Sequence, residues 1–260
     1  MLRIPGLNRN RFYSFGLVAL PVLMWEGLAR AGLLSPIIFP APSLILRAFV
    51  GGLIAGEYAQ DLRITLSRVF LGFLIGGGCG LLLGLGMGWS RAMRETLDPI
   101  IAALHPIPKF ALLPMVIIFF GIGETSRIAM VSIATFFPLL ISTMYGVLQI
   151  PSNYFDVVKN YGGTRLDLLR KVVLPGSFPF VMTGARLSLQ AALTITIGVE
   201  LVFSNSGLGS ILWMAWNTMR MTRLYSVILI VAIIGVVSTF LLEKLKRYLS
   251  PWHREEGHAA

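Results

Sequence analysis

Three basic or titratable residues lie within apolar stretches that are long enough to cross a membrane. At 1.5 Å of helical rise per residue, Lys109 falls roughly 18 Å, and Arg186 roughly 14 Å, from the more basic ends of their stretches. His105 lies one helical turn before Lys109 on the same face. An ionisable group this deep in a membrane has a high free energy of insertion, so its presence requires a structural or functional explanation. With no acidic residue evident at that level, the three predict a path for an anion. The structural alternative is that Arg186 reaches the interface or binds backbone carbonyls of a kinked helix.

The sequence has no motif for catalysis or nucleotide binding. It contains no Gly-Lys dipeptide, which excludes a GxxxxGK[ST] phosphate loop. One cysteine, Cys79, leaves no disulfide framework, and no Cys/His spacing typical of a metal site occurs. Neither paired carboxylates on one face nor a Ser/His/Asp constellation suggests an enzyme. We therefore expect a chain that is not catalytic and that binds no cofactor or metal itself.

The composition indicates an all-α membrane protein. Of the 260 residues, 55% are apolar and only 13% are charged, about half of what soluble domains carry. The net charge of +10 invites comparison with nucleic-acid-binding proteins. However, the basic residues lie at the ends of apolar stretches without interleaved aromatic residues, so they favour membrane orientation over nucleic-acid binding. The length fits one transmembrane domain over 1–260.

About six helices are predicted to span the membrane, each roughly 20 residues long. Prolines break the segment 32–68, in which Ser43 is predicted to cap a short interfacial helix ending near Ile54. The first apolar stretch follows arginines like a signal peptide, but its length exceeds the usual 7–15 residues, so a retained span is favoured over cleavage. The expected spans are 13–31, 69–89, 97–120, 128–148, 177–199 and 224–242.

The distribution of Lys and Arg predicts the orientation. If the N-terminus is cytoplasmic, that side holds thirteen of the 22 basic residues and the other side six, while Arg68, Lys109 and Arg186 lie within spans or at their edges. The positive-inside rule then places both termini in the cytoplasm. The predicted cytoplasmic segments are 1–12, 151–175 and 243–260.

Two spans have distinctive residue patterns. In 97–120, several prolines predict a kinked helix whose freed carbonyls need other partners. In 69–89, glycines recur every four residues and form a smooth face on which another helix backbone can pack closely, within the chain or across a dimer. These glycines are Gly72, Gly76, Gly80, Gly84 and Gly88.

A charged insert at 151–175 interrupts the apolar sequence. After Pro151, the chain is predicted to form a helix that runs to about Tyr161. Gly162 and Gly163 then end this helix, because glycine takes positive φ without strain.

A second short helix is predicted after the glycines. Thr164 with Asp167 three residues later forms a capping-box pattern, and Pro175 marks the end of the helix. Two amphipathic helices in water favour a surface for a partner protein, and a solvated loop with incidental helicity is the alternative. The expected apolar face consists of Leu166, Leu169 and Val173.

The insert resembles the cytoplasmic signature loop of ABC-importer permeases. That loop has an acidic residue followed by two small residues, a glycine six positions after the acidic residue, and an aliphatic residue two positions before Leu-Pro. Asp-Val-Val stands here in place of the usual Glu-Ala-Ala. The matching residues are Asp156, Val157, Val158, Gly162, Val172, Leu174 and Pro175.

The resemblance extends over about 40–252. The segments "FPAPSLILRAF", "TLSRVFLGFLIGGGCGLLLGLGMGWS", "LDPIIAALHPIPKFALLPMVIIFFGIGE" and "NSGLG" resemble the permease branch that imports sulfonates, taurine and nitrate, and "LSPWHREE" is similar to taurine-type permeases. The resemblance implies a type I ABC importer permease fold and a homodimer. It also implies two copies of an ATPase subunit, which would hold ATP and Mg²⁺, and a periplasmic or lipid-anchored substrate-binding protein in a bacterial inner membrane.

The resemblance also suggests roles for individual residues. The insert would dock on the ATPase, with Tyr161 and Leu166 joining the matched positions. Glu124 and Glu200 lie at the outer ends of their spans and are candidates for an outer gate or a binding-protein contact, as are Asn205 and Gly207. Lys109 departs from the family, which commonly has proline there.

Two other classes compete with the importer subunit. A secondary transporter or channel acting alone would be expected to show internal repeats and a central run of acidic or proton-relay residues, neither of which is found. A membrane anchor for a cytoplasmic enzyme would explain the insert but not the kinked spans that carry charges. The identity of the solute is beyond the sequence, because importers of this kind take specificity largely from the binding protein.

Overall fold

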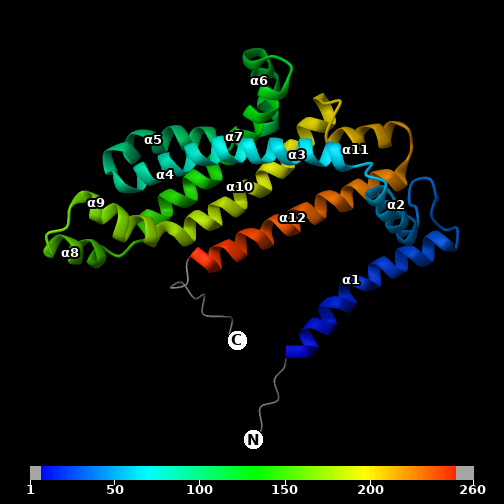
Figure 1. Cartoon of the computed structure of the whole chain (residues 1–260), viewed down its shortest axis with the longest axis horizontal. Helices are drawn as coiled ribbons and strands as arrows, with labels where there is room; N and C mark the ends of the chain where they lie inside the picture. Colours follow the sequence, from blue (N-terminus) through cyan, green and yellow to red (C-terminus); the bar gives the residue numbers. More distant parts are fainter. Residues whose placement is uncertain (1–6, 250–260) are drawn as a thin grey trace, which may run out of the picture.

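The computed structural model describes residues 7–249, and this part of the chain is entirely helical and irregular, without strands. The α-helices are α1 (Leu7–Arg30), α2 (Pro42–Ile54), α3 (Ala59–Gly72), α4 (Gly78–Trp89), α5 (Arg91–Leu104), α6 (Leu113–Phe120), α7 (Glu124–Leu148), α8 (Ser152–Asn160), α9 (Arg165–Leu168), α10 (Leu174–Phe203), α11 (Leu208–Asn217) and α12 (Met221–Leu249). In Figure 1, α3 and α4 lie along the long axis of the molecule, and the long helices α1, α10 and α12 run obliquely to it.

Four helices in the described part are long and apolar enough to cross a membrane, and a bent pair makes a fifth candidate. This confirms an all-α membrane fold. The expected first span corresponds to α1, which has 24 residues but is not among these candidates. The four helices are Ala59–Trp89, Glu124–Leu148, Arg165–Phe203 and Met221–Leu249.

The third expected span is not one kinked helix. It consists of Arg91–Leu104 and Lys109–Phe120, which meet at 89°. Pro106 and Pro108 lie in the break, where each removes a backbone N–H and disfavours helical geometry in the residue before it. The prolines therefore predicted a bend, but their effect is a complete interruption.

The second expected span begins about ten residues earlier than predicted, at Ala59. Arg68 consequently lies inside a continuous helix rather than at its edge. The expected cap at Ser43 is also wrong, because α2 begins at Pro42, whose fixed φ suits the first turn. Ser43 instead binds α1, since its N–H and hydroxyl donate to Glu26 at 2.9 and 2.7 Å.

Two helices extend into the segments that were predicted to be the terminal tails. Helix α1 begins within the expected 1–12 tail, and α12 continues into the expected 243–260 tail as far as Leu249. Residues 1–6 and 250–260 lie outside the described part.

The centre of the bundle is α7, which packs most extensively against α10 and α4. The predicted close packing of the glycine face is confirmed, and it occurs within the chain. A Cβ on Gly76, Gly80 or Gly84 would collide with backbone atoms of α7, and one on Gly72 or Gly88 with Val131 or Val147. This face is therefore filled by α7 and is not available to a second copy.

A π-helical segment, Phe73–Gly77, joins α3 to α4. In an ideal α-helix, positions four residues apart drift by about 40° around the axis. A π-turn is wider and contains more residues, so it opposes this drift. The segment thus helps keep successive glycines directed at α7.

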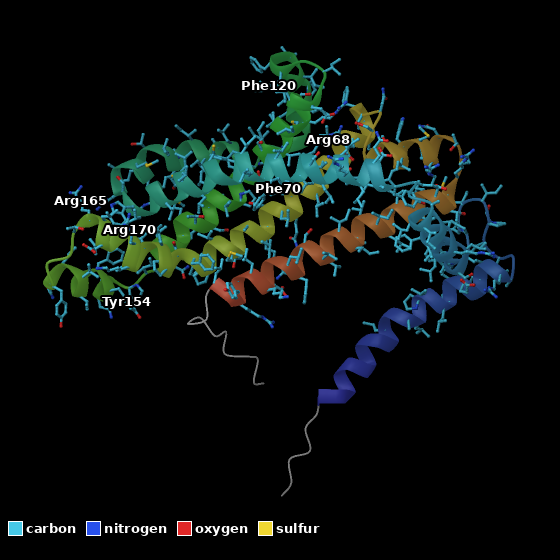
Figure 2. The ribbon with its side chains drawn as sticks, viewed as in Figure 1. Arg68, Phe70, Phe120, Tyr154, Arg165 and Arg170 are labelled. Carbon is cyan, nitrogen blue, oxygen red and sulfur yellow. The ribbon has the colours of Figure 1, made fainter. Side chains whose placement is uncertain are left out.

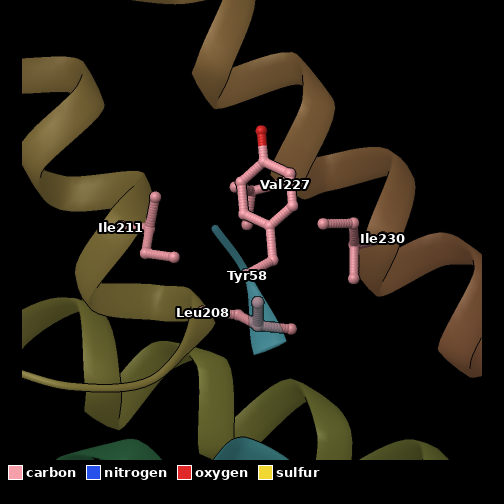
Figure 3. Packing of buried hydrophobic residues seen from close by; sticks show 5 residues of the cluster. All are labelled: Tyr58, Leu208, Ile211, Val227 and Ile230. Atoms are coloured by element: carbon pink, nitrogen blue, oxygen red, sulfur yellow. The ribbon is translucent and has the colours of Figure 1, made fainter. Parts of the chain in front are cut away.

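One end of the bundle is closed by Tyr58, just before α3. The residue is 3% exposed, and its ring packs among Leu208 and Ile211 of α11 and Val227 and Ile230 of α12 (Figure 3). This cluster joins three elements that are far apart in the sequence.

The glycine packing gives a matched test. We expect Gly76→Ala to destabilise the protein by about 2 kcal/mol, because the methyl group would collide with the backbone at Ser132. Gly78→Ala is the control, since a Cβ there meets no atom within 4 Å and alanine favours a helix by up to about 1 kcal/mol. Thermal unfolding of both variants in detergent measures the difference. Equal stability of the two would contradict the packing account.

Candidate functional site

The first half of the insert at 151–175 matches its prediction. Helix α8 ends at Asn160, and Gly162 has a φ of +74°, as expected for the residue that stops the helix. No atom would lie within 4 Å of a Cβ on Gly162, so a substitution there is opposed by backbone conformation and not by contact.

The second half of the insert is partly different. The capping box is confirmed: Asp167 N–H donates to the Thr164 hydroxyl at 3.2 Å, and Thr164 N–H donates to Asp167 at 3.0 Å. However, the helix does not end at Pro175. A π-helical segment, Leu169–Val173, leads directly into α10, where Pro175 occupies the first turn. The missing N–H of proline is tolerated at that position, so the second helix continues into the span.

The exposed apolar surface of the insert lies mainly on α8. Tyr154, Val157 and Tyr161 recur at helical spacing and are 59%, 55% and 90% exposed. Val158 lies instead against Gly163, where a Cβ would collide with its side chain. We call Tyr154, Val157 and Tyr161 the α8 apolar face. Tyr154 is labelled near one tip of the molecule in Figure 2, together with Arg165 and Arg170.

The predicted apolar face of the second helix is only partly right. Of its three residues, Leu166 is exposed and Leu169 is partly buried, whereas Val173 is buried in the bundle, as is the neighbouring Val172. Asp156 and Leu174 are exposed.

Lys109 and His105 come together at the break between α5 and α6. The Lys109 ammonium donates to the carbonyl oxygens of His105 and Ile107, the latter at 3.0 Å. It also lies 4.7 Å from the centre of the Phe137 ring, which His105 meets edge-on at 5.7 Å. Lys109 therefore satisfies carbonyls that the interrupted helix leaves free.

Arg186 is placed differently from its prediction. Its Nη1 donates to Glu243 Oε1 of α12 at 3.0 Å, and both side chains are about half exposed. The expectation that no carboxylate lies near Arg186 is thus wrong, because helix packing brings in a residue 57 positions away. Among the contacts of the described residues, none joins Arg186 to Lys109 or His105.

A second cluster of charges, which the sequence did not predict as a unit, surrounds Arg68. Its side chain is 1% exposed, and all five of its N–H donors have partners. Nε and Nη2 bind the two carboxylate oxygens of Glu124 at 2.7 and 2.5 Å, Nη1 binds Glu200 at 2.8 Å, and the remaining donors reach Ser206. A buried guanidinium is thereby fully paired.

Glu200 is the buried acidic partner. Its carboxylate accepts from Arg68, from the hydroxyl of Thr65 at 2.9 Å and from the N–H of Gly209 at 3.0 Å. Glu124, by contrast, is 55% exposed and also pairs with Arg127. Glu200 therefore cannot touch a partner protein directly in this arrangement, whereas Glu124 can.

The other two predicted outer residues lie in the turn between α10 and α11. Gly207 has a φ of +98°, and a Cβ there would collide with the Glu200 carboxylate. Asn205 is exposed at the turn. The structure thus brings Glu124, Glu200 and Gly207 around Arg68 and leaves Asn205 facing outward.

Sequence reasoning noted the charge of Arg68 but missed its partners. Asp61, Thr65 and Arg68 are spaced i, i+4 and i+7, which places three polar side chains on one face of α3. This spacing was the feature of the sequence from which a polar contact of α3 could have been predicted. It does not show that the contact is with residues near position 200.

The fold and these two sites define a multi-pass helical membrane protein with an exposed apolar helix at one end and a buried ion network elsewhere. The chain belongs to the binding-protein-dependent transport system inner membrane component family, whose model matches residues 76–255. Members of this family are transport subunits.

Curated relatives cover nearly the whole chain. The taurine transport system permease protein TauC of Escherichia coli (strain K12) is 32% identical over 96% of this chain and 92% of its own length. The putative aliphatic sulfonates transport permease protein SsuC of the same strain is 33% identical over 95% of this chain and 94% of its own length.

Solved structures confirm the importer permease fold. The MetNI methionine ABC transporter in an inward-facing conformation matches with a TM-score of 0.61 at 21% identity, covering 71% of this chain and 92% of the other. An amino acid ABC transporter solved with histidines matches with a TM-score of 0.56 at 18% identity, covering 74% of this chain and 92% of the other.

We expect the two glutamates bound to Arg68 to contribute unequally to the free energy of unfolding. Glu200→Ala should destabilise the protein by about 3 kcal/mol, because it breaks a buried pair. Glu124→Ala should cost about 1 kcal/mol or less, because solvent screens that half-exposed carboxylate. Thermal unfolding in detergent compares them directly, and an equal or larger loss for Glu124→Ala would disprove this ranking.

Proposed function

We propose that this chain is the membrane-spanning subunit of an ATP-driven importer for a small anion such as a sulfonate. The α8 apolar face carries the proposal, because three large exposed side chains with apolar rings or branches, two on α8 and one directly after it, are typical of a surface that binds another protein. Membership of a binding-protein-dependent transport family supports it. ATP and Mg²⁺ would be bound by a separate ATPase subunit.

The proposed orientation places α8 in the cytoplasm. Figure 1 shows α8 and α9 at one end of the long axis and α11 toward the other. The excess of Lys and Arg on the α8 side would make that end cytoplasmic, with both termini on the same side of a bacterial inner membrane. The Arg68 network would then lie toward the outer face, where a substrate-binding protein delivers its solute.

We also propose that two copies of this chain form the pathway, each docking one ATPase through its insert. The glycine face is filled by α7 within the chain, so the contact between copies must use other surfaces. The exposed apolar side chains of α6, among them Ile118 and Phe119, are available for such a contact or for lipid.

A small organic sulfonate is the proposed solute class. The named relatives concern taurine and aliphatic sulfonates, and the proposed path residues Lys109 and Arg186 carry the positive charge that an anion would need. Nitrate and similar small anions are the other candidate solutes. Uptake measurements with each labelled anion would distinguish them from sulfonates.

Docking through α8 can be tested with matched charge substitutions. Val157→Glu should release the ATPase from the membrane subunit, because it places a carboxylate in the centre of the α8 apolar face. Lys159→Glu is the control, since it introduces the same residue on the opposite side of the helix. Co-purification measures the effect, with at least a tenfold loss of bound ATPase expected for Val157→Glu alone. Retention of the ATPase by Val157→Glu, in a folded protein, would contradict the docking surface.

The ion pair of α10 and α12 separates two roles of Arg186. If the Arg186 charge serves an anion path together with Lys109 and His105, Arg186→Met should abolish uptake, while Glu243→Gln should leave the arginine charged and uptake substantially intact. If Arg186 acts through its ion pair, the two variants should lose uptake alike. We expect the first result, measured as uptake per assembled complex, and equal losses would remove Arg186 from the path.

A further inference from the structure

The turn between α10 and α11 is held by side chains from other helices. Asp61 accepts from the N–H of Gly207 at 2.6 Å, and Thr65 accepts from the N–H of Leu208 at 2.9 Å. Arg127 donates to the carbonyl of Phe203 at 2.8 Å. The free N–H groups at the start of α11 are therefore bound by Asp61 and Thr65 of α3 and, at Gly209, by Glu200 of α10. Arg127 of α7 binds the carbonyl at the end of α10.

Arg68 occupies the centre of these contacts. It donates to the carbonyl oxygen of Ser206 at 3.0 Å and to its hydroxyl at 3.1 Å, while Glu124 and Glu200 fix the guanidinium from α7 and α10. Figure 2 shows Arg68 where α3 meets the chain between α10 and α11. The turn thus depends on one fully paired side chain that is buried beneath it.

The turn nevertheless presents an exposed polar tip. Asn205 is exposed, whereas Gly207, Leu208 and Gly209 are buried. The half-exposed carboxylate of Glu124 also binds Arg68, so it belongs to the same supported surface. A rigid backbone with outward polar groups costs little entropy on binding a partner, which suits a docking site.

We propose that Arg68 is a positioning residue that holds residues 204–207 in the geometry contacted by the solute-loaded binding protein. This assignment rests on the proposed function and adds to it a named contact surface and the residue that supports it. Arg68 itself touches neither solute nor binding protein.

The geometry requires arginine and not merely a positive charge. The planar guanidinium reaches Glu124 in a bidentate manner while its other donors reach Glu200 and Ser206. A lysine ammonium has three donors on a flexible stem and cannot reproduce this set of five bonds. Arg68→Lys therefore keeps the charge that the buried Glu200 needs and removes most of the support of the turn.

The test is ATP-driven taurine uptake into vesicles that contain the complete importer, with the taurine-loaded binding protein titrated outside. For Arg68→Lys we expect the half-saturating concentration of binding protein to rise at least tenfold, while maximal uptake per assembled complex changes less than threefold. Arg63→Lys is the control, because Arg63 lies on the same helix but is exposed. It should leave both values unchanged.

A second variant keeps the test informative if Arg68→Lys assembles poorly. Ser206→Ala removes the hydroxyl that Arg68 binds and leaves both Arg68 carboxylate pairs in place. It should raise the half-saturating concentration about threefold or more. A spin label at Asn205→Cys, in a Cys79→Ser background, should become more mobile in both Arg68→Lys and Ser206→Ala.

The outcomes are separable. A loss of assembled complex with an unchanged half-saturating concentration in Ser206→Ala would make the network purely structural and overturn the assignment, as would unchanged label mobility. Wild-type vesicles that show no dependence on the binding protein would overturn the proposed function and this assignment with it. If wild-type uptake depends on the binding protein but both variants behave like the wild type, the role assigned to Arg68 is wrong and the proposed function stands.

Discussion

The close backbone contact between α7 and the glycine face of α3 and α4 organises the bundle. In a membrane, moving an apolar side chain from lipid into a helix interface gives little hydrophobic free energy. Helices therefore associate through close packing and hydrogen bonds. Gly76, Gly80 and Gly84 allow the two backbones to meet, and the hydroxyl of Thr135 donates to the carbonyl of Gly72 at 3.2 Å across the contact. Helix α10 also packs against α7, where the Ser188 hydroxyl donates to the Thr135 carbonyl at 2.8 Å.

The ends of these packed helices are suited to different tasks. At one end, Arg68 joins α3, α7 and α10 and leaves no donor of its guanidinium unpaired. At the other end, α8 is attached through a glycine with positive φ and exposes large apolar side chains. Since the π-helical segment Leu169–Val173 connects α9 directly to α10, only the turn at residues 161–164 separates α8 from a continuous helical route into the bundle.

Local patterns were predictable from the sequence, and long-range partners were not. The glycine spacing, the positive φ of Gly162 and the capping box of Thr164 each depend on neighbouring residues, and all three were predicted correctly. The pairing of Arg68 with Glu200, 132 positions away, depends on how helices pack and has no local signature. The same limit applies to the pairing of Arg186 with Glu243.

The effect of proline was predicted incorrectly at two places, because it depends on the position of the proline within the helix. Pro106 and Pro108 interrupt the helix after α5 completely, whereas Pro175 is tolerated at the start of α10.

In the proposed mechanism, this chain moves solute only as part of an ATP-driven complex. Flux of labelled taurine into vesicles measures this most directly, with this chain reconstituted alone and then with its ATPase and binding protein. We expect accumulation against a gradient that requires ATP, the ATPase and the loaded binding protein, and no flux through the chain alone. Taurine movement down its gradient through the chain alone, unaffected by ATP, would rule out this mechanism and indicate a channel or secondary transporter.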